Sequence, residues 1–247
     1  SDPTEGAVSQ SALVFTTLDW AAPQTVTVTG VNDLVQDGPQ PYWVTTAQAI
    51  SSDAAYAAIN PADVPLSNTD NDSAGITVTV AAAPLLTTEA GGSASFTVVL
   101  NSQPTGPVTL GLGSSNLAEG TVSPPSLTFT TLNWNAPQTV TVTGVNDFVQ
   151  DGPQPYTIVT APAASSDPAY AALNPADVVA SNTDNDSAGI TVTAAAAPLV
   201  TTEAGGPASF TVGLNSQPTA SVTIGLSSND VGEGTVSPAV LVFTALN

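Results

Sequence analysis

Lysine, arginine, histidine, cysteine and methionine are all absent from this chain of 247 residues. Without cationic side chains it cannot hold nucleic acid phosphates or an anionic membrane surface by charge. It also cannot build a thiolate or imidazole metal site, a Ser-His-Asp or Cys-His arrangement, a lysine Schiff base or a P-loop. No apolar run approaches the ~18 residues of a spanning helix, so direct membrane insertion is not expected. We therefore expect neither an enzyme nor a nucleic acid partner.

Charge is scarce as well as one-sided. Charged residues make up 8% of the chain, against about 25% in an average soluble protein, and all 20 are Asp or Glu. Apolar residues make up 42%, which is enough to bury a core and argues against disorder. The absence of cysteine excludes disulfides, and the absence of lysine and arginine removes every trypsin site. Both features suit an extracellular or bacterial cell-surface protein.

An internal repeat dominates the sequence. The segment NTDNDSAGITVT occurs at residue 68 and again at residue 182, an offset of 114, and APQTVTVTGVND at residue 22 returns at residue 136 with the same offset. The acidic NTDND segment is the natural boundary between units. It predicts one complete unit, 73–186, preceded by the C-terminal part of a unit (1–72) and followed by the N-terminal part of another (187–247).

Each unit has the pattern of short strands. Apolar residues alternate with polar ones, as in Phe96, Val98 and Leu100 or Val140 and Val142, and turn clusters rich in Pro, Gly and Asn separate the runs. The nearest approach to a helix, AAYAAINPADV, is confined to one turn by Pro61. About seven strands per unit predict an all-β fold of tandem immunoglobulin-like, seven-stranded antiparallel β-sandwiches.

Several acids fall at the ends of these predicted strands, where the loops of a sandwich gather at one pole. In the complete unit they are Glu89, Asp147, Asp151, Asp184 and Asp186, and the repeat places Asp33, Asp37, Asp70, Asp72 and Glu203 at the same positions in the other copies. Carboxylates with no nitrogen or sulfur donor suit Ca²⁺ best, and only a bound cation or a raised pKa can neutralise such a cluster here. The alternative is that these acids are well-separated turn formers at strand ends.

The order of motifs resembles the Calx-β domain. EAGG follows a first strand, TVTVTGVNDFVQD lies in mid-domain, and DND closes the unit. The resemblance covers the chain as one whole and two partial copies. It implies a calcium-binding immunoglobulin-like sandwich, with ligands at the five acids of the complete unit and a further one at Glu119. Asn146, Asn185 and Gln154 stand where stronger binders carry acids, which implies fewer ions or binding near 10⁻⁴–10⁻³ M.

Other singled-out residues have simpler interpretations. Asp167 and Asp177 are expected to cap turns, Trp20 and Trp134 to pack at a corner before a strand, and the four tyrosines to pack in the core. A sugar-stacking role for the tryptophans is the less favoured alternative. No residue pattern marks a carbohydrate groove.

The sequence leaves three classes of function to compare. The favoured one is a structural repeat segment of a secreted or surface protein, stabilised by Ca²⁺ and extended as a stalk or filament. The alternative is an adhesin or binding module that recognises a glycan or protein through its loops, and the near-identity of those loops disfavours it. A glycosidase with paired carboxylates is remote, since no cationic residue is present to hold a sugar.

The partial units carry one further expectation about partners. Together, 1–72 and 187–247 hold every strand of one sandwich, overlapping by 19 residues. Left apart, each would expose strand edges and an apolar face. Either the polypeptide continues as a longer array of neighbouring repeats, which the sequence favours, or separate chains complement one another head to tail. Both predict a fibrous assembly.

Overall fold

The chain is all-β, as the sequence predicts. The computed structural model describes residues 1–246, which contain eighteen strands and no helix. No membrane-crossing helix therefore occurs in the described part of the chain. We call 73–186 the central unit, 1–72 the N-terminal part and 187–246 the C-terminal part.

The central unit holds ten of the strands. They are β5 (Ile76–Val80), β6 (Leu85–Thr88), β7 (Ser93–Leu100), β8 (Val108–Ser114), β9 (Gly120–Ser123), β10 (Ser126–Phe129), β11 (Gln138–Gly144), β12 (Gln154–Thr160), β13 (Ala164–Ser165) and β14 (Val178–Thr183). One sheet has the order β5-β7-β11-β9, and the other has the order β10-β8-β12-β14-β6 with β13 beside β8.

The two sheets of the central unit share one apolar core. Alternation along each strand places Phe96 and Val98 of β7 and Val140 and Val142 of β11 in this core, as predicted. The opposite sheet contributes the alternate residues of its own strands. These include Val108, Leu110, Leu127, Phe129, Tyr156, Ile158, Val178 and Ala180.

Strand number and direction differ in detail from the sequence prediction. The predicted first strand is divided by a bend at 81–84, so that β5 pairs with β7 in one sheet while β6 pairs with β14, in parallel, in the other. The pair Pro124–Pro125 likewise separates β9 from β10, because proline donates no ladder hydrogen bond. The sandwich is therefore divided into more segments than the predicted seven, and one pair is parallel.

The two outer parts contain only paired strands. The N-terminal part has β1 (Gly6–Val8) with β2 (Val28–Gly30) and β3 (Gln40–Val44) with β4 (Val64–Asn68). The C-terminal part has β15 (Ile190–Ala194) with β16 (Phe210–Leu214) and β17 (Val222–Gly225) with β18 (Val240–Phe243). Each pair repeats a central pair 114 positions away, so the local pairing of the strands follows the repeat.

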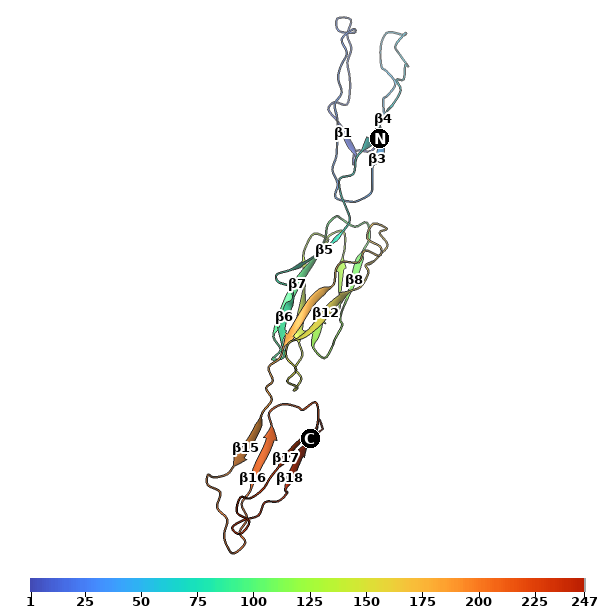
Figure 1. Cartoon of the computed structure of the whole chain (residues 1–247). Coiled ribbons are helices and arrows are strands. Elements are labelled where there is room, and N and C mark those ends of the chain that lie inside the picture. The colour runs from blue at the N-terminus through green and yellow to red at the C-terminus, as the bar shows by residue number, and fades with distance from the viewer. Residues whose placement is uncertain (247) are drawn as a thin grey trace.

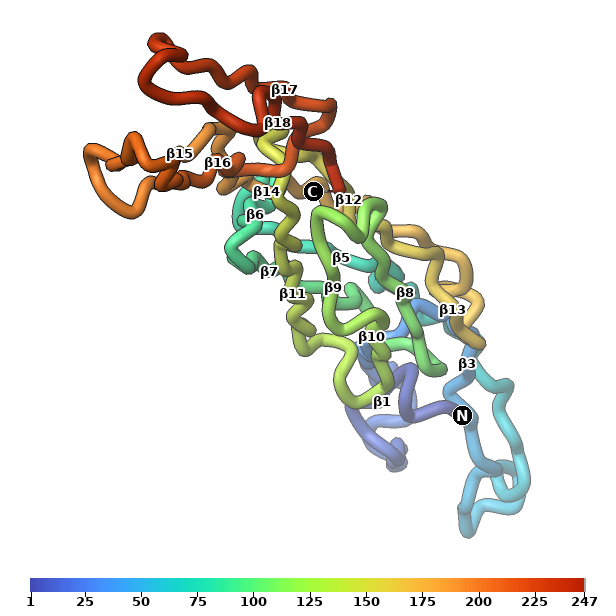
Figure 2. The backbone as a smooth tube through the Cα atoms, turned by 90° about the horizontal axis from the view of Figure 1, so that it is seen from below, coloured from blue at the N-terminus to red at the C-terminus, as the bar shows by residue number. Residues whose placement is uncertain are grey.

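The three parts follow one another along a long axis (Figure 1), and in a perpendicular view the outer parts lie on opposite sides of the central unit (Figure 2). At the first junction the Leu34 carbonyl accepts from Gln103 N at 2.6 Å, and Gln36 Oε1 accepts from Ala74 N at 2.5 Å. The second junction repeats both bonds, from Gln217 N to the Phe148 carbonyl at 2.6 Å and from Ala188 N to Gln150 Oε1 at 2.7 Å. The joint between successive units is therefore the same at both places.

Candidate metal centre

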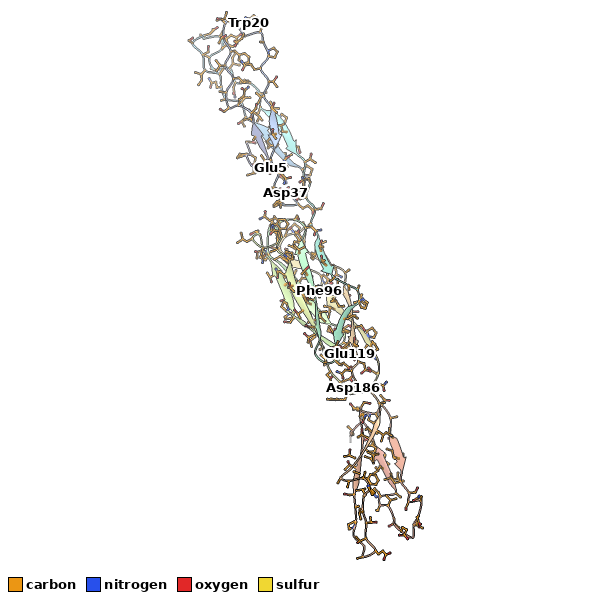
Figure 3. All side chains as sticks on the ribbon, turned by 90° about the vertical axis from the view of Figure 1, so that its left-hand side faces the viewer. Glu5, Trp20, Asp37, Phe96, Glu119 and Asp186 are labelled. Atoms are coloured by element: carbon orange, nitrogen blue, oxygen red, sulfur yellow. The ribbon has the colours of Figure 1, made fainter. Side chains whose placement is uncertain are left out.

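The loops at one end of the central unit bring its acids together. Glu89 follows β6, Glu119 precedes β9, and Asp147 and Asp151 lie in the loop after β11. Asp186 follows β14 and lies beside Glu119, at the end of the central unit that faces the C-terminal part (Figure 3). Convergence of these loops at one pole is what the sandwich topology predicts.

Two groups of three carboxylates meet there. One oxygen each from Glu89, Asp147 and Asp186 lies within 4.8 Å of the other two, and the same holds for Glu119, Asp147 and Asp151. Asp147 belongs to both groups. The arrangement thus offers two neighbouring cation positions that share one carboxylate, with hard oxygen donors only.

Asp184 has a different place in the site from the one the sequence predicts. Its Oδ2 accepts from the backbone N–H groups of Asp151 at 3.0 Å and Gly152 at 2.7 Å, and its Oδ1 accepts from Asp186 N at 2.6 Å. The N–H groups of Asp186 and Gly152 lower the pKa of this carboxyl. Asp184 therefore braces the loop that presents Asp151, and it belongs to neither group of three.

Burial and like charge make the first group electrostatically costly. The Glu89 side chain is only 3% exposed, and its burial, together with the negative charges of Asp147, Asp184 and Asp186, raises its pKa above the ordinary value. One backbone bond, from Asn185 N to Glu89 Oε2 at 3.0 Å, opposes this rise. Since the chain has no cationic side chain, no protein group compensates the cluster.

An unsatisfied atom lies in the same place. Among the residues that the structure describes, Asp186 Oδ2 is the one buried side-chain oxygen or nitrogen without a hydrogen-bond partner. Two carboxylates ~4 Å apart repel by roughly 4 kcal/mol at an effective dielectric of 20. A buried carboxylate that has one oxygen without a donor and belongs to a group with two further carboxylates fits a cation, which can satisfy the oxygen and offset the repulsion.

A buried polar network positions the second group, which is Glu119, Asp147 and Asp151. Asn182 Nδ2 donates to Glu119 Oε2 at 3.3 Å and to the Val145 carbonyl at 2.9 Å, while Thr87 Oγ1 donates to Asn182 Oδ1 at 3.0 Å. Thr87 also bonds the Tyr156 hydroxyl at 3.0 Å. These contacts hold the Glu119 carboxylate and the start of the Asp147 loop in place.

The N-terminal part contains a second copy of the site, and Glu5 is a member that sequence reasoning missed. Glu5, Asp33 and Asp37 form a group with the same 4.8 Å spacing. Glu5 lies 114 positions before Glu119, so the repeat itself was the signal that identifies it. Asp70 repeats the brace, because its Oδ2 accepts from Gly38 N at 2.7 Å and Asp37 N at 3.1 Å.

The N-terminal site contains an open cavity at the place that the Glu89 turn fills in the central site. Its acids line a cavity of about 210 Å³, to which Asp72 and Asn68 also contribute. In the central unit the turn that carries Glu89 occupies the corresponding place. Its counterpart, Glu203, is exposed in the C-terminal part and belongs to no group of acids in the described residues.

Inside the central unit, Asp167, Trp134 and the tyrosines lie as the sequence predicts, and Asp177 does not. Asp167 caps the turn at 167–171 through Ala169 N at 2.9 Å and also accepts from Thr105 N at 2.7 Å. The prediction for Asp177 was wrong, because its Oδ1 accepts from the N–H group of Thr160 at 2.8 Å, which is a contact across seventeen residues and not a turn cap. Trp134 packs against the core, and the central tyrosines, Tyr156 and Tyr170, are buried.

The predictions for Trp20 and Tyr56 were wrong. Trp20 is 72% exposed and Tyr56 is 61% exposed, although their central counterparts are packed. In the central unit, Trp134 and Tyr170 bond to Leu100 at the end of β7 and to Ser102 just after it, and the N-terminal part has no counterpart of these residues. Tyr42 is buried, as predicted.

No protein family model matches the chain, and no curated protein matches it. Similar solved structures include WR4, an MSP family member of C. elegans, at 14% identity and a TM-score of 0.30, covering 44% of this chain and 96% of that one. The E. coli chaperone DraB is similar at 10% identity and a TM-score of 0.33, and the match covers 62% of this chain and 91% of DraB. Domains 4 and 5 of the S-layer protein SbsC are similar at 15% identity and a TM-score of 0.29, and the match covers 65% of this chain and 82% of that one. All three likenesses are too remote to assign a function, and the Calx-β resemblance stays a prediction.

Proposed function

We propose that this chain is a Ca²⁺-stabilised structural repeat segment of a secreted or cell-surface protein, related to Calx-β domains, that extends as a stalk or filament and has no catalytic role. The observation that carries the proposal is the group of Glu89, Asp147 and Asp186, which leaves Asp186 Oδ2 buried without a donor. A cation at this point satisfies that oxygen and compensates the three charges. Oxygen-only ligands favour Ca²⁺ over softer metals.

The position of the group links the ion to extension. Asp186 lies between the last strand of the central unit, β14, and the first strand of the next, β15. In the same linker, Ala188 N donates to Gln150 Oε1 of the loop that carries Asp147 and Asp151. An ion held by Asp147 and Asp186 therefore ties the linker to the pole and limits bending between units.

An extracellular location is supported by what the chain lacks. It has no lysine or arginine, so that trypsin-like proteases find no site in it, and it has no cysteine that requires a particular redox environment. The alternative role, recognition of a glycan or protein by the loops, gains no support from loops that repeat so closely.

The proposal is tested by thermal unfolding in Ca²⁺ and in EGTA at neutral pH. A ligand that binds only the native state at one hundred times its Kd adds about 2.7 kcal/mol, which raises the Tm of a unit of this size by several degrees. We expect Asp186→Asn to abolish most of this Ca²⁺-dependent rise.

The matched control is Asp53→Asn, which removes one negative charge at an exposed turn outside all three groups. It should leave the Ca²⁺-dependent rise intact. Equal midpoints of the unsubstituted chain in Ca²⁺ and in EGTA would refute calcium stabilisation. If Asp53→Asn reduces the Ca²⁺-dependent increase in Tm as much as Asp186→Asn does, the increase is a general effect of charge and not of a specific site.

A further inference from the structure

The two outer parts of the chain carry complementary sets of strands. In the central unit, β7 pairs with β11 and β8 pairs with β12, which joins the first half of the repeat to the second. The C-terminal part has the counterparts of β7 and β8, namely β16 and β17. The N-terminal part has the counterparts of β11 and β12, namely β2 and β3. In the described residues, each of these four strands pairs only with its hairpin neighbour.

Some repeat positions occur in both outer parts, and each part forms a different strand from them. Repeat positions 115–133 occur in both outer parts, so each could supply the counterparts of β9 and β10. The N-terminal part forms only the first of these, as β1, and the C-terminal part forms only the second, as β18. Residues 12–15 and 234–237, the duplicates, form no strand. The two parts thus hold the counterparts of eight of the ten central strands without repetition, and only β6 and β13 have no counterpart strand in them.

Several apolar residues that are buried in the central unit have exposed counterparts in the outer parts, although Tyr42, the counterpart of Tyr156, is buried. Phe96 of β7 is 2% exposed, whereas its counterpart Phe210 of β16 is 39% exposed. Val178 of β14 is 3% exposed, whereas its counterpart Val64 of β4 is 50% exposed. Within the described residues, each outer part therefore has an apolar face with open strand edges.

We propose that the C-terminal part of one copy of this chain docks on the N-terminal part of a second copy and completes a sandwich like the central unit. The sequence on each face is the repeat of a half that already fits the other half inside the central unit. Complementarity is therefore encoded in the chain itself, and a second copy is the occupant that matches both strand order and side chains. The docking does not depend on calcium.

The central registers specify the contact between copies. Val140 of β11 lies opposite Phe96 of β7, so Val26 of one copy faces Phe210 of the other. Joining β16 to β2 gives a sheet of order β15-β16-β2-β1. Ile158 lies opposite Ser114 in the second sheet, so Val44 faces Ser228 and β17 joins β3. Both sheets then have their hairpin pairs on the outside and the new ladders in the middle.

The open N-terminal cavity marks where the second copy enters. In the central unit the Gly92 carbonyl accepts from Gly144 N at 3.1 Å, and a Cβ at Gly144 would lie 2.3 Å from the Thr88 carbonyl oxygen. Gly30 is the counterpart of Gly144, and in the described residues no backbone approaches it so closely. The turn at 202–206 of a second copy would fill that space and bring Glu203 to the acids of the 210 Å³ cavity.

This contact uses different surfaces on the two partners, so it is heterologous and does not close on itself. The joint of each outer part with the central unit is the same at both ends, so docking continues the existing arrangement of units. The assembly therefore grows into a filament of alternating central and two-copy sandwiches.

The test is disulfide cross-linking in the chain, which has no native cysteine. Thr27→Cys with Ser209→Cys places thiols at the counterparts of Thr141 and Ser95, which lie opposite each other on the outer face of the sheet. The two positions lie in opposite end parts of one molecule (Figure 1), so that only contact between copies brings them together. Mild oxidation should give a ladder of multiples of 24.4 kDa on a non-reducing gel.

The matched control is Thr27→Cys with Thr191→Cys. Thr191 is an exposed residue of the same part, but it lies on β15, one strand farther from the docking edge. It should give at least tenfold less cross-linked product. Equal cross-linking of the two pairs would overturn the proposal. So would a mass of 24.4 kDa by light scattering at every concentration up to ~200 µM, which would show that the faces do not bind each other.

Repeating the in-register experiment with Ca²⁺ and with EDTA separates this proposal from the cation site. If Glu203 of one copy joins Asp33 and Asp72 of another, Ca²⁺ should increase the length of the ladder, and this part rests on the proposed function. A ladder that forms equally in EDTA supports docking and argues against a shared ion. A ladder in neither condition overturns the docking itself.

Discussion

Identical repeat positions have different environments in the central unit and in the two outer parts. Phe96 and Phe210 lie in corresponding strands with corresponding hairpin partners, yet the first is buried and the second is 39% exposed. Tyr170 and Tyr56 differ in the same way. The pairing of neighbouring strands is thus local and survives in half a unit, whereas burial requires the strands of the other half.

The acidic sites of the central unit and of the outer parts also differ in how complete they are. The central pole collects its acids from four loops that span both halves of the unit, and it buries Glu89 among them. The N-terminal site lacks the Glu89 position and is an open cavity, and Glu203 stands alone. A complete site of this kind therefore depends on the same non-local contacts as the core.

The largest expected difference concerns the core aromatic. Phe96→Ala removes a buried ring and should destabilise the central unit by about 3–5 kcal/mol. Phe210→Ala should cost less than about 1 kcal/mol in dilute solution, where chains are not associated. Urea unfolding followed by far-UV circular dichroism measures both, because the C-terminal part has no tryptophan to report on it. Equal costs in dilute solution would show that the C-terminal face is covered within a single chain.

A smaller difference in stability is expected between alanine substitutions at Gly144 and at its repeat counterpart, Gly30. A Cβ at Gly144 would lie 2.3 Å from a backbone oxygen, which cannot move aside alone, so Gly144→Ala should cost about 1–3 kcal/mol. At Gly30 the closest atoms belong to the Asn68 side chain, which can rotate, so Gly30→Ala should cost less in the unassociated chain. Thermal unfolding of both variants is the measurement, and a larger loss for Gly30→Ala would contradict this account.

The smallest effect concerns pH in the absence of divalent cations. Burial, reinforced by nearby carboxylates, raises the folded-state pKa of Glu89, so its ionisation destabilises the fold above that pKa and the cost disappears as pH falls through it. Glu89→Gln should therefore raise the Tm by a few degrees at pH 7 in EDTA, with a gain that shrinks towards acid pH.

Glu203→Gln, at the exposed counterpart, should leave the Tm unchanged at every pH in dilute solution. The lowered pKa of Asp184 acts in the opposite sense, because its contribution to stability is present above its unfolded pKa and is lost as pH falls. A gain for Glu89→Gln that grows towards acid pH would contradict a raised folded-state pKa of Glu89.

Much of the fold could be predicted because its signals are local. The alternation of Phe96, Val98 and Leu100 predicts their burial, and the offset of 114 predicts where each hairpin recurs. The pole of the site could also be predicted, since Asp147 and Asp186 follow strands that end together. The brace made by Asp184 could not, because DND does not reveal which acid accepts from the backbone and which faces its neighbours.

The sequence by itself determined the all-β class, the alternation of buried residues along the strands, the repeat and the absence of any cationic side chain. All of these depend on residue types or on spacing along one stretch of chain. Only the tertiary structure decided that β6 crosses to the second sheet, that Asp147 serves two groups of acids and that Asp186 Oδ2 is left without a donor. Those outcomes depend on how loops far apart in sequence approach one another, and a period of two along a strand carries no information about that approach.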